Sequence, residues 1–248
     1  MPKATQGQES TRCAKKNQLR LVAQFRYPYT DITGAVLFYK VRYSLIDRKT
    51  GEVVGKTFGY RSRNGRRKPP EADSYPYQLR ALYTALSDGD DLLICEGEKD
   101  CELAAEHWEI AATTHHQGSA GWSAGQAAWF ARGDRMGISG AKRSHIYIAV
   151  DRDKTGAVLA WDTFRLLVLH GRIAPNRITF VKSAVPRVGA DIGDHIAAGL
   201  PASELIVMRQ SQVRDLARAY VSERARGPRS GSGPWSSGRS TRSGGSRG

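Results

Sequence analysis

From residue 92 onward the chain repeats one pattern: a short apolar run, a turn, and a longer segment with apolar residues at helical spacing. The apolar runs are too brief for helices, so we interpret them as buried parallel strands. Strands are expected over residues 92–95, 111–114, 144–150 and 177–182. Helices are expected over residues 77–88, 98–107, 125–132 and 157–170, over a segment that opens at 189 and ends at 198, and over 211–226. This rhythm predicts an α/β fold, in which a parallel sheet is flanked by helices through right-handed crossovers.

A strict alternation of apolar and polar residues precedes this region and predicts a half-buried antiparallel strand. One face of that strand is expected to carry Leu37, Tyr39, Val41, Tyr43 and Leu45, and the other face Lys40, Arg42 and Ser44. A possible first strand over 19–27, a turn over 47–52 and a returning strand over 53–60 complete the unit. We therefore expect a small antiparallel β subdomain ahead of the α/β domain.

Five segments follow from these patterns and from local composition. They are a disordered N-terminus (1–18), a small basic β-hairpin subdomain (19–75), the α/β domain (76–208), a C-terminal basic helix (209–226) and a disordered Gly/Ser/Arg tail (227–248). The first and last segments are polar and lack any periodic apolar pattern, which is typical of chains that cannot bury a core.

The charge of the chain points to a polyanionic partner. Its 38 Lys and Arg residues exceed its 24 Asp and Glu residues, which gives a net charge of +14 and a pI near 10.0. Such a balance is typical of proteins that bind nucleic acid, although generic solubility charge is the alternative. The sequence has no apolar run long enough for a membrane span and no signal-peptide pattern. Three scattered cysteines fit neither a zinc site nor a disulfide framework, so we expect a protein of the reducing cytoplasm.

A basic run follows the expected hairpin and is too polar to pack in a core. We interpret it as a phosphate-gripping loop with aromatic residues nearby for stacking, and a solvated linker is the alternative. The candidate phosphate contacts in this region are Lys40, Arg42, Arg61, Arg63, Arg66 and Arg67. Lys99 and Lys154, which lie beside acidic residues, are further candidates.

Acidic residues follow two of the expected strands at the point where each strand ends. Glu96 follows the strand at 92–95, and Asp151 and Asp153 follow the strand at 144–150. Side chains two residues apart on a strand point the same way, so the two aspartates are expected to face one point. If the strands are neighbours, Glu96 joins them at the carboxyl edge of the sheet, where open α/β sheets bind ligands. Three clustered carboxylates repel one another, and a divalent cation with oxygen ligands, Mg²⁺ or Mn²⁺, resolves the conflict.

The turn Glu96-Gly97-Glu98-Lys99-Asp100, followed later by Asp151-Arg152-Asp153, resembles the TOPRIM domain of DnaG-type primases, topoisomerases and some nucleases. The resemblance covers about residues 27–200 and is closest to bacterial and phage primases of the primase-helicase kind. It implies a Rossmann-like parallel sheet in which Asp151 and Asp153 are metal ligands and Glu96 is a ligand or the general base. It also implies that Asp100 and Asp191 contribute to the metal site, although Asp191 fits the N-cap of a helix equally well.

The same resemblance implies a primase that makes RNA primers on single-stranded DNA from nucleoside triphosphates with Mg²⁺ or Mn²⁺. No zinc-binding spacing precedes the α/β region, so a replicative helicase or a separate zinc-bearing primase subunit is expected as a partner. No phosphate-cradling motor loop, dinucleotide fingerprint or Ser-His-Asp order is present in the sequence. Two alternatives stay open: a metal-dependent nuclease that uses the same acids with water as the acceptor, and a non-catalytic nucleic-acid-binding module.

Overall fold

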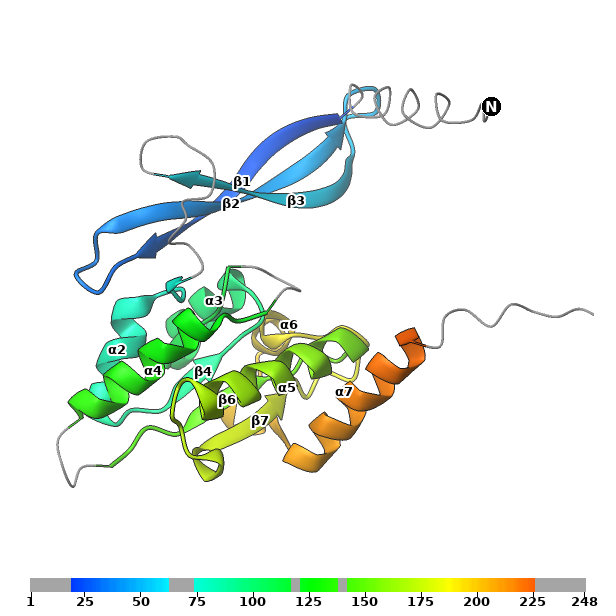
Figure 1. The fold of residues 1–248 in the computed structure, drawn as a ribbon. Helices are drawn as coiled ribbons and strands as arrows, with labels where there is room; N and C mark the ends of the chain where they lie inside the picture. Colours follow the sequence, from blue (N-terminus) through cyan, green and yellow to red (C-terminus); the bar gives the residue numbers. More distant parts are fainter. Residues whose placement is uncertain (1–18, 63–73, 117–120, 138–141, 226–248) are drawn as a thin grey trace, which may run out of the picture.

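The computed structural model describes residues 19–62, 74–116, 121–137 and 142–225, which form two sheets (Figure 1). The first is an antiparallel sheet with the order β1-β2-β3, made of β1 (Leu19–Thr30), β2 (Val36–Asp47) and β3 (Val53–Ser62). The Asp31 carboxylate holds the first turn by accepting the backbone N–H groups of Thr33 and Ala35, at 2.9 and 3.0 Å. The expected antiparallel unit is confirmed, and its first strand runs three residues further than the pattern predicted.

The second sheet has five strands in the order β5-β4-β6-β7-β8. The strands are β4 (Leu92–Ile94), β5 (Ala111–Thr113), β6 (Ile146–Ala149), β7 (Ile178–Lys182) and β8 (Ile206–Met208). The first four are parallel to one another, whereas β8 pairs antiparallel with β7 at the edge. The parallel strands were expected from their apolar runs. The three-residue β8 was not predicted, because Ile206 and Val207 are exposed and the strand carries no alternation.

Helices cover both faces of this sheet, which explains why its strands are mostly apolar. One face carries α2 (Leu79–Asp88), α4 (Ala124–Met136), α5 (Lys154–Leu169) and α7 (Gln210–Ala225), and the other carries α3 (Glu98–Trp108) and α6 (Ile192–Ala197). Short 3₁₀ helices at Pro175–Arg177 and Ala202–Glu204 connect the later elements. Along β4, Leu92 and Ile94 pack on the first side and Leu93 on the second.

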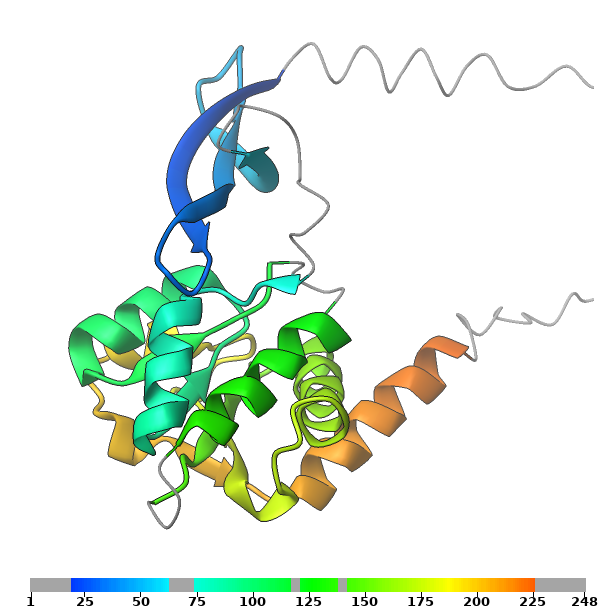
Figure 2. The same cartoon turned by 60° about the vertical axis from the view of Figure 1, so that its left-hand side comes forward.

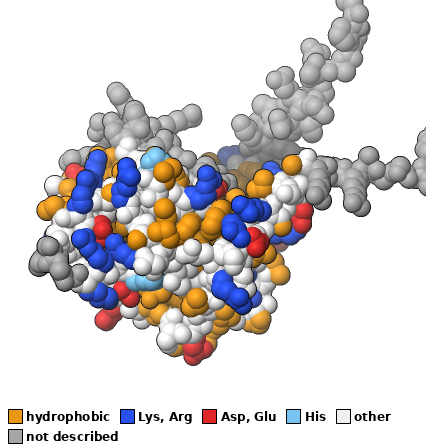
Figure 3. Space-filling view, turned by 60° about the horizontal axis from the view of Figure 1, so that its bottom comes forward, with side chains coloured by type: hydrophobic (Ala, Val, Ile, Leu, Met, Phe, Trp, Pro, Cys, Tyr) orange, Lys and Arg blue, Asp and Glu red, His pale blue; other side chains and the backbone are white. Residues whose placement is uncertain are grey.

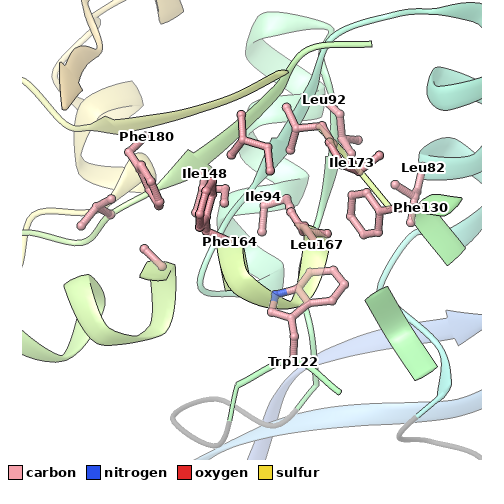
Figure 4. Packing of buried hydrophobic residues seen from close by; sticks show 14 of the residues in the cluster. Leu82, Leu92, Ile94, Trp122, Phe130, Ile148, Phe164, Leu167, Ile173 and Phe180 are labelled. Atoms are coloured by element: carbon pink, nitrogen blue, oxygen red, sulfur yellow. The ribbon is translucent and has the colours of Figure 1, made fainter. Parts of the chain in front are cut away.

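The larger core lies under α2, α4 and α5 and is built from interlocking aromatic and aliphatic side chains (Figure 4). Phe164 packs against Phe180 of β7 with ring centroids 5.6 Å apart, and Trp122 meets Phe130 edge to face at 5.6 Å. Phe130, Phe180 and Leu167 are fully buried. These contacts fix α5 against the sheet and thereby fix the position at which α5 begins, beside Asp151.

The antiparallel sheet stands on the α/β part and packs its near end against α2 and α3 (Figure 2). Tyr29 stacks on Phe38 at 4.6 Å and contacts Tyr77 at 5.2 Å, and the Tyr60 hydroxyl donates to the His116 carbonyl at 2.8 Å. The second hydrophobic cluster therefore runs continuously from β1 and β2 into the α3 side of the larger sheet.

This contact shows which face of β2 meets the α/β part. Phe38 and Lys40 point toward it and are buried, while on the apolar face Val41 is buried and Leu37 and Tyr39 are half-buried. The alternation identified the strand correctly. Alternation alone does not show which face of the strand meets a neighbouring part of the molecule. Here it is the face with Lys40, because Lys40 pairs with Glu98.

Positive charge is spread beyond the antiparallel sheet. Figure 3 shows Lys and Arg side chains at several places on the face seen from below, with hydrophobic side chains between them. None of the helices in the described ranges is both long and apolar enough to cross a membrane. The expected N-terminal segment 1–18 and tail 227–248 lie outside the described residues.

Candidate active site

The turn between β4 and α3 places acidic residues at the carboxyl edge of the larger sheet. The Cys95 N–H donates to the Thr113 carbonyl at 3.0 Å, and the Thr114 hydroxyl donates to the Glu96 carbonyl at 3.0 Å. These bonds anchor the backbone of Glu96 to the neighbouring strand. The helix then begins at Glu98 with Gly97 as its N-cap, and acids in a first helical turn are stabilised by the helix dipole.

Asp151 follows β6 directly beside this turn. The Val150 N–H donates to the Val181 carbonyl at 2.8 Å, which extends the pairing with β7 to the residue before Asp151. Gly156 is required here, because a Cβ at that position would lie 2.7 Å from the Asp151 carbonyl oxygen. The absence of a side chain at Gly156 lets α5 pack its first turn directly against Asp151.

The alternation argument does not extend to Asp153. The strand ends at Ala149, two residues before Asp151, so period-two geometry does not extend to Asp153. Its carboxylate is the N-cap of α5 and accepts the Gly156 N–H at 2.6 Å. Asp153 therefore has a helix-capping role, and its assignment as a metal ligand together with Asp151 stays a prediction.

Electrostatic coupling shows which acids lie together. Burial raises the pKa of Asp151 to about 9, with further upward contributions from the charge of Glu96, a side-chain hydrogen bond with Glu96, and the charges of Asp100 and Asp191. Burial likewise raises the pKa of Asp100 to about 7, together with the charge of Asp191, while the Gly193 N–H opposes the shift. The structure thus brings Glu96, Asp100, Asp151 and Asp191 into one cluster from three separate segments of the chain.

Asp191 is the N-cap of α6 and also lies among the acids of the cluster. It caps α6 by accepting the Asp194 N–H at 2.8 Å, and Asp194 accepts the Asp191 N–H in return at 3.2 Å. At the same time its charge acts on Asp100 and Asp151. A Cβ on Gly193 would lie 2.9 Å from Asp100 Oδ1 and 3.3 Å from Asp191 Oδ1. Gly193 therefore permits the first turns of α3 and α6 to approach with their acids side by side.

The donor chemistry of this cluster fits a hard divalent cation, because carboxylate oxygens are the ligands that Mg²⁺ and Mn²⁺ prefer. In the arrangement described, Glu96 and Asp151 are instead joined by a hydrogen bond that needs one proton. No group of three or more His, Cys, Asp or Glu side chains within the described ranges is arranged to hold a metal ion. A cation would replace that proton and relieve the repulsion that raises the pKa of Asp151.

The candidate phosphate contacts have different surroundings. Lys40 is buried against Glu98, with Nζ 2.7 Å from Oε1, so its interpretation as an exposed phosphate contact is wrong. Lys154 pairs with Glu223 at 2.6 Å at the surface, and Lys99 is exposed beside the acidic turn. Arg42 is half-buried and Arg61 is exposed on the antiparallel sheet. The remaining candidates, Arg63, Arg66 and Arg67, lie outside the described residues.

The face of the antiparallel sheet that carries Lys40 also carries exposed aromatic rings next to a basic group. Phe25 and Phe58 are 47% and 45% exposed, values that are high for phenylalanine. They flank Arg42 as its partners on the two neighbouring strands. The Arg42 guanidinium lies over the Phe25 ring at 5.8 Å. We refer to Phe25, Arg42 and Phe58 as the aromatic strip.

Two functional candidates, Glu98 and Tyr29, were missed by sequence reasoning. Glu98 was seen only as part of the acidic turn, yet it is 3% exposed and binds both Lys40 and Tyr29. The available signal was the alternation itself, which already placed Lys40 on the opposite face from the tyrosines Tyr39 and Tyr43. A lysine on a face that packs against another part of the molecule requires either solvent or a carboxylate partner.

Comparison with known proteins identifies the fold. No protein-family model matches the sequence, and no curated protein matches it significantly. The Aquifex aeolicus primase structure, comprising zinc-binding and RNA polymerase domains, superposes with a TM-score of 0.50 at 15% identity, covering 87% of this chain and 50% of that one. A DnaG catalytic core gives 0.49 at 13% identity, covering 88% and 65% of the two chains. The primase fragment of the bacteriophage T7 primase-helicase gives 0.45 at 13%, covering 75% and 64%.

The chain therefore spans about half the length of the Aquifex structure and has the fold of a primase catalytic core. The expected fold class, a helix-flanked parallel sheet preceded by a small antiparallel β unit, is confirmed. At this level of identity the likeness shows the fold alone.

Proposed function

We propose that this chain is a DnaG-like primase: a metal-dependent nucleotidyltransferase that makes RNA primers on single-stranded DNA from nucleoside triphosphates. One observation carries the proposal. Within a primase-core fold, carboxylates from three distant segments gather at the carboxyl edge of the sheet, where α/β enzymes hold their ligands. The cluster consists of Glu96, Asp100, Asp151 and Asp191.

In this proposal Glu96 and Asp151 hold a Mg²⁺ or Mn²⁺ ion, with Asp100 and Asp191 completing the acidic surroundings. When bound, the cation neutralises the triphosphate and lowers the pKa of the attacking hydroxyl. The chain itself supplies the geometry. The β4–α3 turn fixes Glu96 through Thr114, and Gly193 lets Asp100 approach Asp191. Asp153 keeps α5 in place as its N-cap through Oδ1 and is included as a further metal ligand, and exposed Lys99 would contact a phosphate group.

The aromatic strip is the proposed surface for the template. Exposed phenylalanine rings stack on unpaired bases at about 1–3 kcal/mol per base, without sequence preference. Arg42 supplies positive charge for the phosphates beside these rings, whereas Arg61 lies over the Tyr43 ring on the opposite face. The net charge of +14 favours encounter with DNA. The strip lies on the face of the sheet that carries Lys40, which reaches the acidic turn through Glu98.

We include a replicative helicase or a zinc-bearing primase subunit in the proposal as a partner. The Aquifex structure contains a zinc-binding domain together with its RNA polymerase domain, and this chain covers half of that structure. The partner is tested by adding it to the synthesis reaction.

The decisive experiment is primer synthesis from labelled ribonucleotides on single-stranded DNA with Mg²⁺ or Mn²⁺, with and without the partner. The wild type should make short RNA, and Glu96→Gln and Asp151→Asn should lose synthesis while still binding DNA. Asp162→Asn is the matched control, because this aspartate is exposed on the outer side of α5. Metal-dependent degradation of the DNA without synthesis would instead identify a nuclease. If the wild type shows no turnover and none of the acid variants alters DNA binding, the chain is a binding module.

A further inference from the structure

A buried ion pair joins the antiparallel sheet to the acidic turn. Lys40 Nζ lies 2.7 Å from Glu98 Oε1 and 2.9 Å from Oε2, and the Tyr29 hydroxyl donates to Oε1 at 2.7 Å. The side chains of Lys40 and Glu98 are 6% and 3% exposed, and Tyr29 is fully buried. Burial and the charge of Glu98 raise the pKa of Tyr29 well above its ordinary value, so its hydroxyl remains a hydrogen-bond donor. We call these three residues the latch.

The latch holds the turn at its centre. Glu98 is the first residue of α3, two residues after Glu96 and two before Asp100. Fixing the Glu98 side chain against β1 and β2 therefore fixes the backbone that carries both neighbouring acids. Both groups that bind the Glu98 carboxylate, the Lys40 ammonium and the Tyr29 hydroxyl, come from the antiparallel sheet, so the position of the turn depends on how that sheet docks.

Packing alone would dock the two parts without this pair. Tyr29, Phe38 and Tyr77 already form a continuous aromatic contact between them. A buried ion pair must overcome a large desolvation cost and adds little stability over apolar side chains of the same volume. The ion pair instead fixes the orientation of the Glu98 carboxylate, because both of its oxygens are held by donors at defined positions.

We propose that Lys40 and Tyr29 are positioning residues: through Glu98 they hold the Glu96–Asp100 turn in the geometry that the acidic centre requires. They also tie that turn to the sheet that carries the aromatic strip, so that DNA bound on the strip is aligned with the acids. The catalytic consequence rests on the proposed primase function. The structural consequence, an ordered turn, can be measured without it.

The test uses the full chain and compares Lys40→Met with Lys40→Arg, which keeps the charge. The triple variant Tyr29→Phe, Lys40→Met, Glu98→Met removes every polar group of the latch while keeping side-chain volume. Lys142→Met is the matched control, because Lys142 pairs with Asp91 at 3.2 Å in an exposed position. Far-UV circular dichroism verifies folding, and the probe for the acidic centre is Mn²⁺ alone, followed by electron paramagnetic resonance.

Lys40→Met and the triple variant should bind Mn²⁺ about 10-fold more weakly, as expected when a residue supporting a metal site is lost. Amide hydrogen exchange over residues 96–101 should accelerate about 10-fold, since the turn loses its anchor. Lys40→Arg should restore most of the protection, and Lys142→Met should match the wild type. In primer synthesis Lys40→Met should lower kcat and leave the KM for DNA unchanged.

Wild-type exchange and Mn²⁺ affinity in a folded triple variant would overturn the proposal. If the triple variant does not fold, equal exchange in Lys40→Met and wild type would overturn it instead, and protection restored by Lys40→Arg would support it. A wild type that makes no primer would defeat the proposed function, and the exchange measurement would still decide whether the latch orders the turn.

Discussion

Asp151→Asn should stabilise the protein at neutral pH while abolishing its proposed activity. Burial and the nearby charge of Glu96 raise the pKa of Asp151 from 3.8 to about 9. Between those two values the folded state holds a proton on Asp151 that the unfolded state releases. Stability therefore falls as pH rises through this window, and the loss is complete above the folded pKa. Asparagine cannot ionise, so it removes the penalty.

The magnitude follows from the same shift. One pKa unit corresponds to about 1.36 kcal/mol, and roughly three units separate the unfolded pKa from pH 7, which gives about 4 kcal/mol without screening. Asp151 is only half-buried, so solvent reduces the expected gain to about 1–3 kcal/mol. For a domain of this size, that gain raises Tm by roughly 2–10 °C.

Thermal unfolding of wild type and Asp151→Asn, followed by circular dichroism at pH 5, 7 and 9, checks this prediction. The difference in Tm should grow with pH, since the other titrating groups are common to both proteins. Asp162→Asn, on the exposed side of α5, should show no such growing difference. If Asp151→Asn melts below the wild type at pH 7, or if the difference does not change with pH, a raised pKa for the Asp151 carboxyl beside Glu96 is refuted.

Three further substitutions test separate parts of the account. Gly193→Ala places a methyl group 2.9 Å from Asp100 Oδ1 and should weaken Mn²⁺ binding about 10-fold in a titration, whereas unchanged binding would separate Asp100 from the site. Arg42→Ala should weaken single-stranded DNA binding and reduce the salt slope by about 1 in fluorescence anisotropy, and an unchanged slope would exclude a phosphate contact. Phe180→Ala, in the fully buried core, should lower the unfolding free energy by about 3–5 kcal/mol in urea, and a loss below 1 kcal/mol would contradict the packing described.

The parallel sheet could be predicted because strands that are buried on both faces consist of short apolar runs, which are recognisable in the sequence. The same runs placed Glu96 and Asp151 correctly, since a strand that stops at an acid delivers that acid to the sheet edge. Asp100 and Asp191 came from the family resemblance. The structure shows why they lie close together. Gly193 has no side chain, so α3 and α6 can approach each other at that residue.

The failures share one cause, which is that local pattern does not report tertiary partners. Asp153 was placed by extending strand geometry beyond the true end of β6, where the N-terminus of α5 uses its carboxylate as a cap. Lys40 was interpreted as a phosphate contact, because its partner Glu98 lies 58 residues away in the sequence. Strand β8 was missed because two of its three residues are exposed at a sheet edge.

The central claim is that acids from distant segments of the chain bind one cation at this sheet edge. Crystals soaked in Mn²⁺ and measured by anomalous scattering test it most directly. The account predicts a peak between the Glu96 and Asp151 carboxylates, on the side of Asp100 and Asp191, with the hydrogen bond between Glu96 and Asp151 broken. Saturating Mn²⁺ that leaves this position empty, with the two side chains still bonded to each other, would contradict it.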